Sequence, residues 1–198
     1  MSTRNIVLLS VLGLLVLLVG YGCNGYNGLV QKDQNVKAKW ANVESDYQRR
    51  SDLIPNLVNT VKGAANFEQE TITQVIEARA KATQTTIKAD DLSPEKIASF
   101  QKAQGELSGA IGRLLVSVER YPELKATEAF RDLQAQIEGT ENRIKVSRND
   151  FNAAVQDYNT SAKRFPLVLF AGMFGFTEKG FFTADAGAEK APTVDFNK

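Results

Sequence analysis

The sequence predicts an all-α protein, with an N-terminal transmembrane helix followed by an elongated antiparallel bundle of three long helices and a short apolar C-terminal segment. Three observations indicate this fold. Residues 6–19 form an apolar run, and long stretches of the remaining chain repeat apolar residues every three, four or seven positions. A polar connection and a proline separate these stretches. Such a narrow repeat is typical of helices that pack along a seam.

Residues 1–25 form the predicted membrane anchor or signal segment. No charge lies between Arg4 and Lys32, and this uncharged stretch exceeds the ~20 residues that cross a bilayer. Three interpretations are open: an uncleaved anchor in contact with membrane lipid, a lipoprotein lipidated on Cys23, and a secreted chain from which the segment is removed. The very short N-terminal tail favours a single pass with a cytoplasmic N-terminus and an extracytoplasmic body, on the periplasmic or cell-surface side.

The composition narrows the classes of function. The chain has no histidine and one cysteine, so the commonest metal ligand and the usual acid–base residue are both missing. Without residues 1–23, the chain has 23 basic and 23 acidic residues, a neutral body with no electrostatic footprint for nucleic acid. We therefore expect no enzyme activity, no cofactor or metal, and no nucleic-acid partner.

The first helical stretch is expected over residues 27–82. Trp40 and Tyr47 are seven positions apart and are expected to lie in its seam. Pro55 lies inside the pattern, where it removes the hydrogen bond to the carbonyl of Ser51 and is expected to kink the helix. Gly63 is a second weak point.

The second helix follows a polar connection over residues 83–93. Ser93 is its expected N-cap, before a proline and a glutamate that suit the first turn. Gly105, Gly109 and Gly112 cost helix stability, which we expect the close approach of a neighbouring helix to offset.

The third helix is expected to begin after a short turn. Pro122 ends the second helix, and Thr127 is the expected cap of the third, so the two are antiparallel neighbours. Because three helices would run outward, back and outward again, the C-terminal tail is expected to emerge far from the anchor.

Two groups of polar residues are candidates for interaction. Arg49, Arg50 and Asp52 precede Pro55, where they form either a docking patch or charge compensation around the backbone defect.

The other group lies on the third helix. Glu141 and Arg148 are seven positions apart, and Asn152 and Asn159 continue nearby. These residues either line a polar cleft or form a network that fixes the register between helices.

The C-terminal tail, residues 167–198, is the best functional candidate. Residues 165–176 hold four phenylalanines and no charge, and two more phenylalanines follow shortly after. The segment is too short to span a bilayer. Three interpretations are open: it folds back as core, it packs against another subunit, or it dips into a membrane. The candidate interaction residues are Phe170, Phe174, Phe176, Phe181 and Phe182.

Many short blocks of the sequence occur together in one known family. They are Tyr26-Asn27-Gly28-Leu29-Val30, Arg49-Arg50-Ser51-Asp52-Leu53-Ile54-Pro55-Asn56-Leu57-Val58, Glu119-Arg120-Tyr121-Pro122-Glu123-Leu124-Lys125-Ala126, Arg148-Asn149-Asp150-Phe151-Asn152 and Ala191-Pro192-Thr193-Val194-Asp195-Phe196. In these blocks and their order the chain resembles the LemA family over nearly all of residues 4–198. Phe67 departs from the pattern, since members often carry a histidine there.

The resemblance implies a bacterial membrane protein with an N-terminal anchor and an exported helical bundle, here residues 26–166. It supplies no biochemical activity. The occurrence of such proteins beside TPM-domain membrane proteins and HtpX-type proteases implies work in the cell envelope with other membrane proteins.

From these observations we expect an extracytoplasmic scaffold or adaptor that assembles into a homo-oligomer. The alternative is a bundle that senses a ligand or peptide and signals through its membrane-proximal helix.

Overall fold

The computed structural model describes residues 3–63 and 67–184. Its helices are α1 (Thr3–Lys62), α2 (Gln69–Gln84), α3 (Pro94–Val118), α4 (Pro122–Lys125), α5 (Glu128–Lys163) and α6 (Val168–Ala171), followed by the 3₁₀-helix η1 (Gly172–Phe174). No strand occurs within the described ranges. The prediction of an all-α chain is therefore confirmed.

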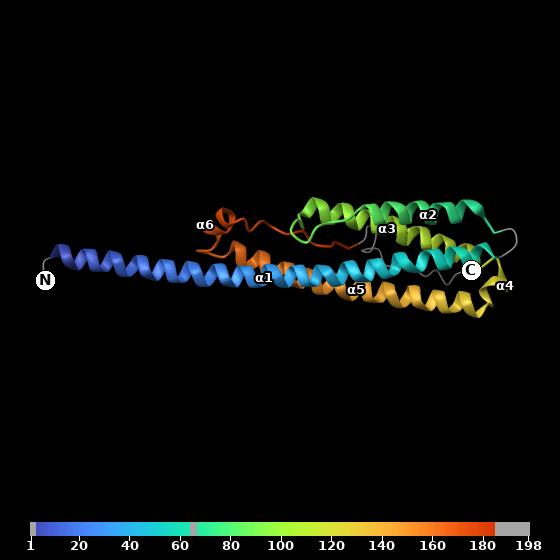
Figure 1. The fold of residues 1–198 in the computed structure, drawn as a ribbon, viewed down its shortest axis with the longest axis horizontal. Helices are drawn as coiled ribbons and strands as arrows, with labels where there is room; N and C mark the ends of the chain where they lie inside the picture. The colour runs from blue at the N-terminus through green and yellow to red at the C-terminus, as the bar shows by residue number, and fades with distance from the viewer. Residues whose placement is uncertain (1–2, 64–66, 185–198) are drawn as a thin grey trace, which may run out of the picture.

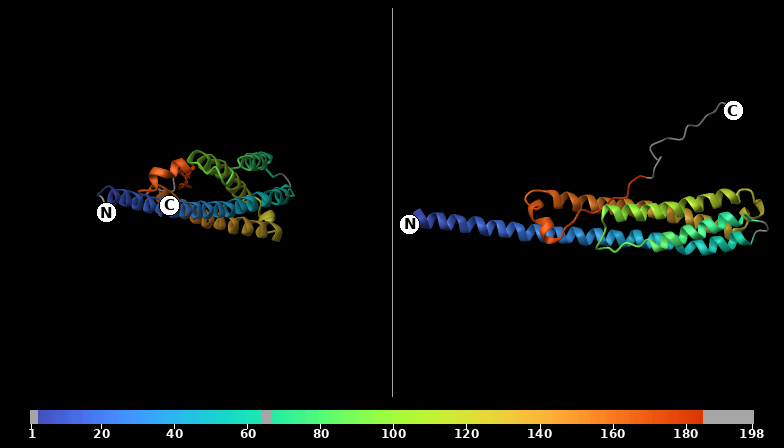
Figure 2. Two further views of the ribbon diagram at one scale, coloured as in Figure 1. Left: turned by 60° about the vertical axis from the view of Figure 1, so that its left-hand side comes forward. Right: turned by 90° about the horizontal axis from the view of Figure 1, so that it is seen from above.

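Two pairs of helices build the bundle. α1 and α5 pack along each other as a long antiparallel pair, and α2 and α3 form a second pair that lies against it (Figure 1). The N-terminal third of α1 projects beyond the bundle as a single helix in every view (Figures 1 and 2). Among the α1 residues whose side chains the structure describes, Leu29 is the first that is buried.

The helix starts follow the sequence signals. Ser93 occupies the cap position of α3, with Pro94 at the first helical position. The hydroxyl of Thr127 caps α5 by accepting a hydrogen bond from the Phe130 N–H at 3.3 Å.

The expectation of three long helices is wrong in one respect. The stretch over residues 27–82 is not one helix, because α1 ends at Lys62 and α2 begins at Gln69. The chain continues helically through Pro55 and leaves the helix at Gly63, where glycine costs about 1 kcal/mol relative to alanine. The reversal lets Ile72 and Val75 of α2 bury against the far half of α1.

The additional reversal changes where the tail emerges. With α2 running back, α3 runs outward and α5 returns toward the start of the chain, so α6 lies beside α1 at the near end of the bundle (Figure 1). The expectation that the tail emerges far from residues 1–25 is therefore wrong. The same topology gives α3 and α5 opposite directions, but α3 packs chiefly along α2 and α5 along α1.

The three glycines of α3 are not sites of close helix approach. Gly105, Gly109 and Gly112 are exposed, and a Cβ added to Gly105 or Gly112 would meet no atom within 4 Å. The expectation of a neighbouring helix at these positions is wrong. The seam residues Leu107, Ile111 and Leu114 are buried, so the glycines lie on the opposite, outward face.

Aromatic side chains fill the half of the core nearer the projecting end of α1. Trp40 is fully buried, as predicted for a seam residue, and its ring centroid lies 5.2 Å from Phe100, 5.4 Å from Phe151 and 6.2 Å from Phe182. Tyr47 is also buried and contacts Phe100. The core thus takes one aromatic residue from the C-terminal tail.

The extended tail passes so close to the start of α3 that only glycine fits at position 180. The Gly180 N–H donates to the Leu92 carbonyl at 2.9 Å, and a Cβ at this position would lie 2.6 Å from Pro94 Cα. Because backbone cannot yield as a side-chain tip can, we predict that Gly180→Ala lowers the free energy of unfolding by about 1–3 kcal/mol.

The matched control is Gly112→Ala, at an open and exposed helical position. It is expected to raise the free energy of unfolding by about 0.5–1 kcal/mol. Urea unfolding followed by circular dichroism measures both. Equal effects of the two substitutions would contradict the close approach at Gly180.

Candidate functional site

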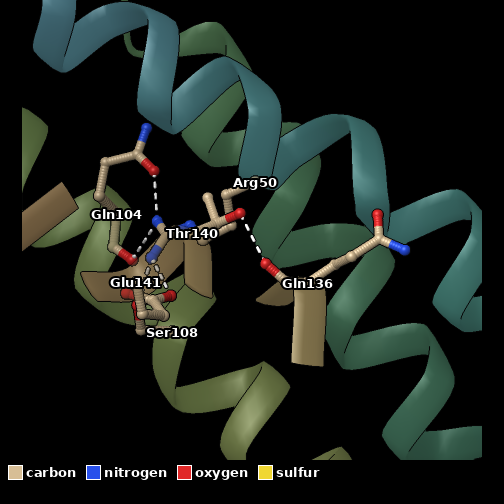
Figure 3. A network of polar contacts seen from close by, with 6 residues as sticks. All are labelled: Arg50, Gln104, Ser108, Gln136, Thr140 and Glu141. Carbon is tan, nitrogen blue, oxygen red and sulfur yellow. Dashed lines mark hydrogen bonds and ion pairs between the residues drawn. The ribbon is translucent and has the colours of Figure 1, made fainter. Parts of the chain in front are cut away.

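Arg50 is the centre of a polar cluster that joins three helices (Figure 3). Its side chain is buried on α1. Nη1 donates to Ser108 Oγ at 2.5 Å and to Glu141 Oε1 at 2.8 Å, while Nη2 donates to the Gln104 carbonyl at 3.1 Å and to Gln104 Oε1 at 2.6 Å. The guanidinium also stacks 5.0 Å from the Tyr47 ring centroid. One side chain therefore ties α1 to α3 and α5.

The three charged residues before Pro55 have different surroundings. Arg50 is 1% exposed, whereas Arg49 and Asp52 lie on the exposed face of α1, where Asp52 accepts a hydrogen bond from Gln48 at 2.7 Å. The structure does not bring the three together as one surface patch. Arg50 lies between packed helices, but its hydrogen bonds go to Gln104, Ser108 and Glu141 and not to the carbonyl at the proline.

The carbonyl that Pro55 leaves free has a donor from another helix. Pro55 has no N–H to give to the Ser51 carbonyl, and Arg79 Nε of α2 donates to that oxygen at 2.9 Å. Sequence reasoning identified the free carbonyl and missed Arg79, which carries no distinguishing pattern. The contact holds α2 against α1 at the proline.

We predict that this hydrogen bond depends on Pro55. Arg79→Ala is expected to lower the free energy of unfolding by about 1–2 kcal/mol in the natural chain. In a Pro55→Ala background the cost is expected to be smaller, because the new N–H at position 55 can satisfy the Ser51 carbonyl within α1. A double-mutant cycle in urea measures the coupling. Equal costs of Arg79→Ala in the two backgrounds would show that Arg79 acts independently of the proline.

Polar side chains of α5 hold the backbone of the extended tail. Asn152 accepts from the Phe182 N–H at 2.9 Å and donates to its carbonyl at 2.8 Å. Asn159 makes the same pair of bonds with Lys179, at 3.0 and 2.8 Å. Seven helical residues rise about 10.5 Å and three extended residues span about 10 Å, so the two spacings match.

Further side chains complete this clamp. Gln101 of α3 bonds the Thr183 N–H and carbonyl at 3.0 and 2.8 Å, and Arg148 donates to the same carbonyl at 2.9 Å. Glu141 belongs instead to the Arg50 cluster. The side chains of Asn152, Asn159 and Arg148 thus fix the register of the tail against α5.

A buried lysine of the tail is paired with α1. Lys179 is 5% exposed, and its Nζ lies 2.7 Å from Asp33 Oδ1 and 4.9 Å from the Tyr158 ring centroid. Burial raises the pKa of the Tyr158 phenol to about 12, with the Asp33 carboxylate adding to the rise. The neutral hydroxyl donates to the Thr177 carbonyl at 3.0 Å.

Asp33 also contacts a lysine of its own helix. Hydrogen bonds to Asp90 and Asp33 raise the pKa of Lys37.

The candidate phenylalanines of the tail divide into two sets. Phe182 is buried in the core and Phe176 is partly buried against it. Phe170 and Phe174 are 44% and 58% exposed, and Phe181 is 41% exposed. Phe176 and Phe182 therefore fold back onto the core, whereas Phe170 and Phe174 of the preceding turn, and Phe181, remain largely uncovered.

Tyr26 of α1 lies against the uncovered turn. Its ring centroid is 5.3 Å from Phe174 and 5.6 Å from Phe176, and Leu167 packs at Gly25. The sequence alone does not indicate this contact, because it depends on the direction in which α5 runs.

Two further features bear on the site. Over the ranges that the structure describes, no helix combines the length and apolar character that a membrane crossing requires. In the same ranges, no three His, Cys, Asp or Glu side chains are grouped so as to hold a metal ion. Cys23 lies within α1, and its side chain is outside the described part of the structure.

The fold and these contacts define an elongated helical-bundle protein whose longest helix continues past the bundle and whose tail is clamped back onto it. The chain belongs to the LemA family, whose sequence profile matches residues 39–196.

Curated relatives share this sequence at low identity. It is 26% identical over 175 residues to magnetosome protein MamQ 2 of Paramagnetospirillum magneticum, which covers 79% of this chain. It is 25% identical over 174 residues to magnetosome protein MamQ of Magnetospirillum gryphiswaldense. Protein LemA of Metamycoplasma hominis is 23% identical over 142 residues, which cover 71% of this chain and 61% of that protein. The chain spans 64% of the length of the MamQ relatives.

Proposed function

We propose that the protein is a membrane-anchored helical scaffold or adaptor of the bacterial cell envelope. The observation that carries this proposal is the continuity of α1. One helix of 60 residues, about 90 Å long, carries both the apolar run over residues 6–19 and the buried seam of the bundle. A movement or position of the anchor is thereby passed directly to the bundle core.

The surroundings of the projecting part of α1 support an anchor. Leu8, Leu9 and Leu12 are 61%, 53% and 57% exposed, on a stretch that no other described element accompanies (Figure 1). Exposed apolar side chains along an isolated helix are unfavourable in water, and a lipid bilayer would cover them.

The polar clusters support a stiff, structural bundle. Arg50 locks three helices together, and the side chains of α5 clamp the tail along its length. The MamQ relatives are named as magnetosome proteins.

The proposal includes association of several copies. Ile76 and Val146 are exposed on α2 and α5, where they offer apolar contact to a second bundle. Light scattering of the detergent-extracted full-length protein, with intact mass spectrometry of the same sample, tests this part. A defined oligomer that retains residues 1–22 supports the assembly, and a monomer at all concentrations refutes it. A diacylglycerol-sized adduct on a chain that begins at Cys23 would replace the helical anchor with a lipid.

A further inference from the structure

The turn between α5 and the extended tail presents apolar side chains to the outside. Phe165 is 80% exposed, Leu169 60%, Met173 82% and Phe174 58%. No charge occurs between Arg164 and Glu178. An uncovered patch of this composition marks a surface that meets another apolar phase. We call residues 165–174 the apolar turn.

The apolar turn lies at the level where the apolar run of α1 leaves a bilayer. Counting the ~20 residues of a membrane span from Ile6 ends the span at Gly25. Leu167 packs at Gly25, and the Phe174 ring meets the ring of Tyr26. The turn is thus beside the predicted exit point of the helix, at one height along the long axis (Figure 1).

Charged side chains begin on the bundle side of this level in all three neighbouring segments. On α1 the first charged residue after Arg4 is Lys32, whose Nζ lies 2.5 Å from Oδ2 of Asp157 on α5. On the tail the first charged residue is Glu178, whose Oε1 lies 2.7 Å from Nζ of Lys163 at the end of α5. An apolar zone that changes to a charged zone at a common height is the pattern of a protein surface at a membrane interface.

We propose that the apolar turn is a second membrane contact, inserted into the headgroup and upper acyl region of the membrane that α1 crosses. This inference rests on the proposed anchor. The occupant of the patch is a lipid surface, because the patch is continuous with the apolar run of α1. A second copy would need a matching apolar face at the same height. Lipidation of Cys23 would place the membrane at the same level.

The second contact gives the anchor a fixed orientation. A single crossing helix can tilt and rotate about its axis, whereas a helix with a lateral insertion beside its exit cannot rotate without withdrawing the insertion. The clamp by Asn152 and Asn159 holds the chain directly after the turn, so the turn is presented at a fixed place. The structure thereby couples the orientation of the bundle to the membrane plane.

The test uses the full-length chain in phosphatidylcholine vesicles, with Cys23→Ala and one new cysteine carrying an environment-sensitive fluorophore. Met173→Cys places the label in the apolar turn. Val116→Cys is the matched control, an exposed apolar position on α3 that is 71% exposed. Leu12→Cys reports the anchor. Lipids spin-labelled high or low on the acyl chain quench the label from the membrane, and iodide quenches it from water.

If the proposal holds, the Met173 label shifts to the blue and is quenched by the shallow spin label. The Val116 label is quenched by iodide alone, and the Leu12 label by the deep spin label. If Leu12 is quenched and Met173 behaves like Val116, the apolar turn is not a membrane contact although the anchor stands. If Met173 is shielded from both lipid and iodide, a second copy covers it and the proposal is wrong. If Leu12 is not quenched by lipid, the anchor itself fails and the proposal fails with it.

Discussion

Arg50→Ala is expected to lower the free energy of unfolding by about 2–5 kcal/mol, because it truncates a fully buried side chain and leaves the buried Gln104 oxygens without their donor. The substitution removes the Nη1 bonds to Ser108 and Glu141 and both Nη2 bonds to Gln104. Gln104 is itself buried, so its oxygens lose their cationic donor and keep little access to water. A cavity between α1, α3 and α5 adds to the loss.

The neighbouring Arg49 is the matched control. Arg49 has the same charge and is the preceding residue of the same helix, but its side chain is exposed. Arg49→Ala is therefore expected to change the free energy of unfolding by at most about 0.5 kcal/mol. Arg50→Met keeps much of the volume and separates packing from hydrogen bonding. Urea unfolding by circular dichroism measures all three. An Arg50→Ala effect no larger than that of Arg49→Ala would refute the role of Arg50 as a lock.

Phe182→Ala, as a single substitution, is expected to lower the free energy of unfolding by about 3–5 kcal/mol, the range for other buried phenylalanines. Phe182 is 5% exposed and lies among Trp40, Phe100 and Phe151. The residue comes late in the chain, yet its ring completes the core around α1. Because Trp40 is the single tryptophan, its emission reports the same substitution locally and is expected to shift to the red.

Phe181 provides the comparison within the same pair. Its side chain is 41% exposed, so Phe181→Ala is expected to lower the free energy of unfolding by less than about 1 kcal/mol and to leave the Trp40 emission unchanged. A similar loss in both variants would mean that the tail does not seat Phe182 in the core.

Periodicity and cap residues predicted the helical class and two helix starts. The seam of Leu107, Ile111 and Leu114 is buried as its spacing requires, and Thr127 caps α5. The break after Lys62 was not predicted, because the apolar repeat continues through Gly63 into α2. A repeat reports which face of a helix is buried, and it carries no information on where the chain reverses direction. The position of the tail was therefore predicted at the wrong end.

The sequence indicated that these polar side chains make buried contacts, but it did not indicate which residues they contact. The spacing of Asn152 and Asn159 indicated one helix face, but the partner is an extended backbone that has no periodic pattern of its own. Gln104 lies three positions before Leu107 in the apolar repeat of α3, and a polar residue at such a position indicates a buried polar partner.

The repeat of α1 itself separates Arg50 from Arg49, because Arg50 falls in the seam between Tyr47 and Ile54 and Arg49 does not. The repeat carried no information on which residues of the other helices would contact Arg50.

The most direct test of the anchored scaffold is alkaline extraction of membranes from bacteria that produce the full-length chain. The natural protein is expected to remain in the membrane pellet, and a Leu9→Lys/Leu12→Lys variant is expected to move to the supernatant, because charge within a span disfavours insertion. A Val116→Lys variant, altered on the bundle, is expected to stay in the pellet. Release of the natural protein into the supernatant with residues 1–22 intact would contradict the anchor on which the account depends.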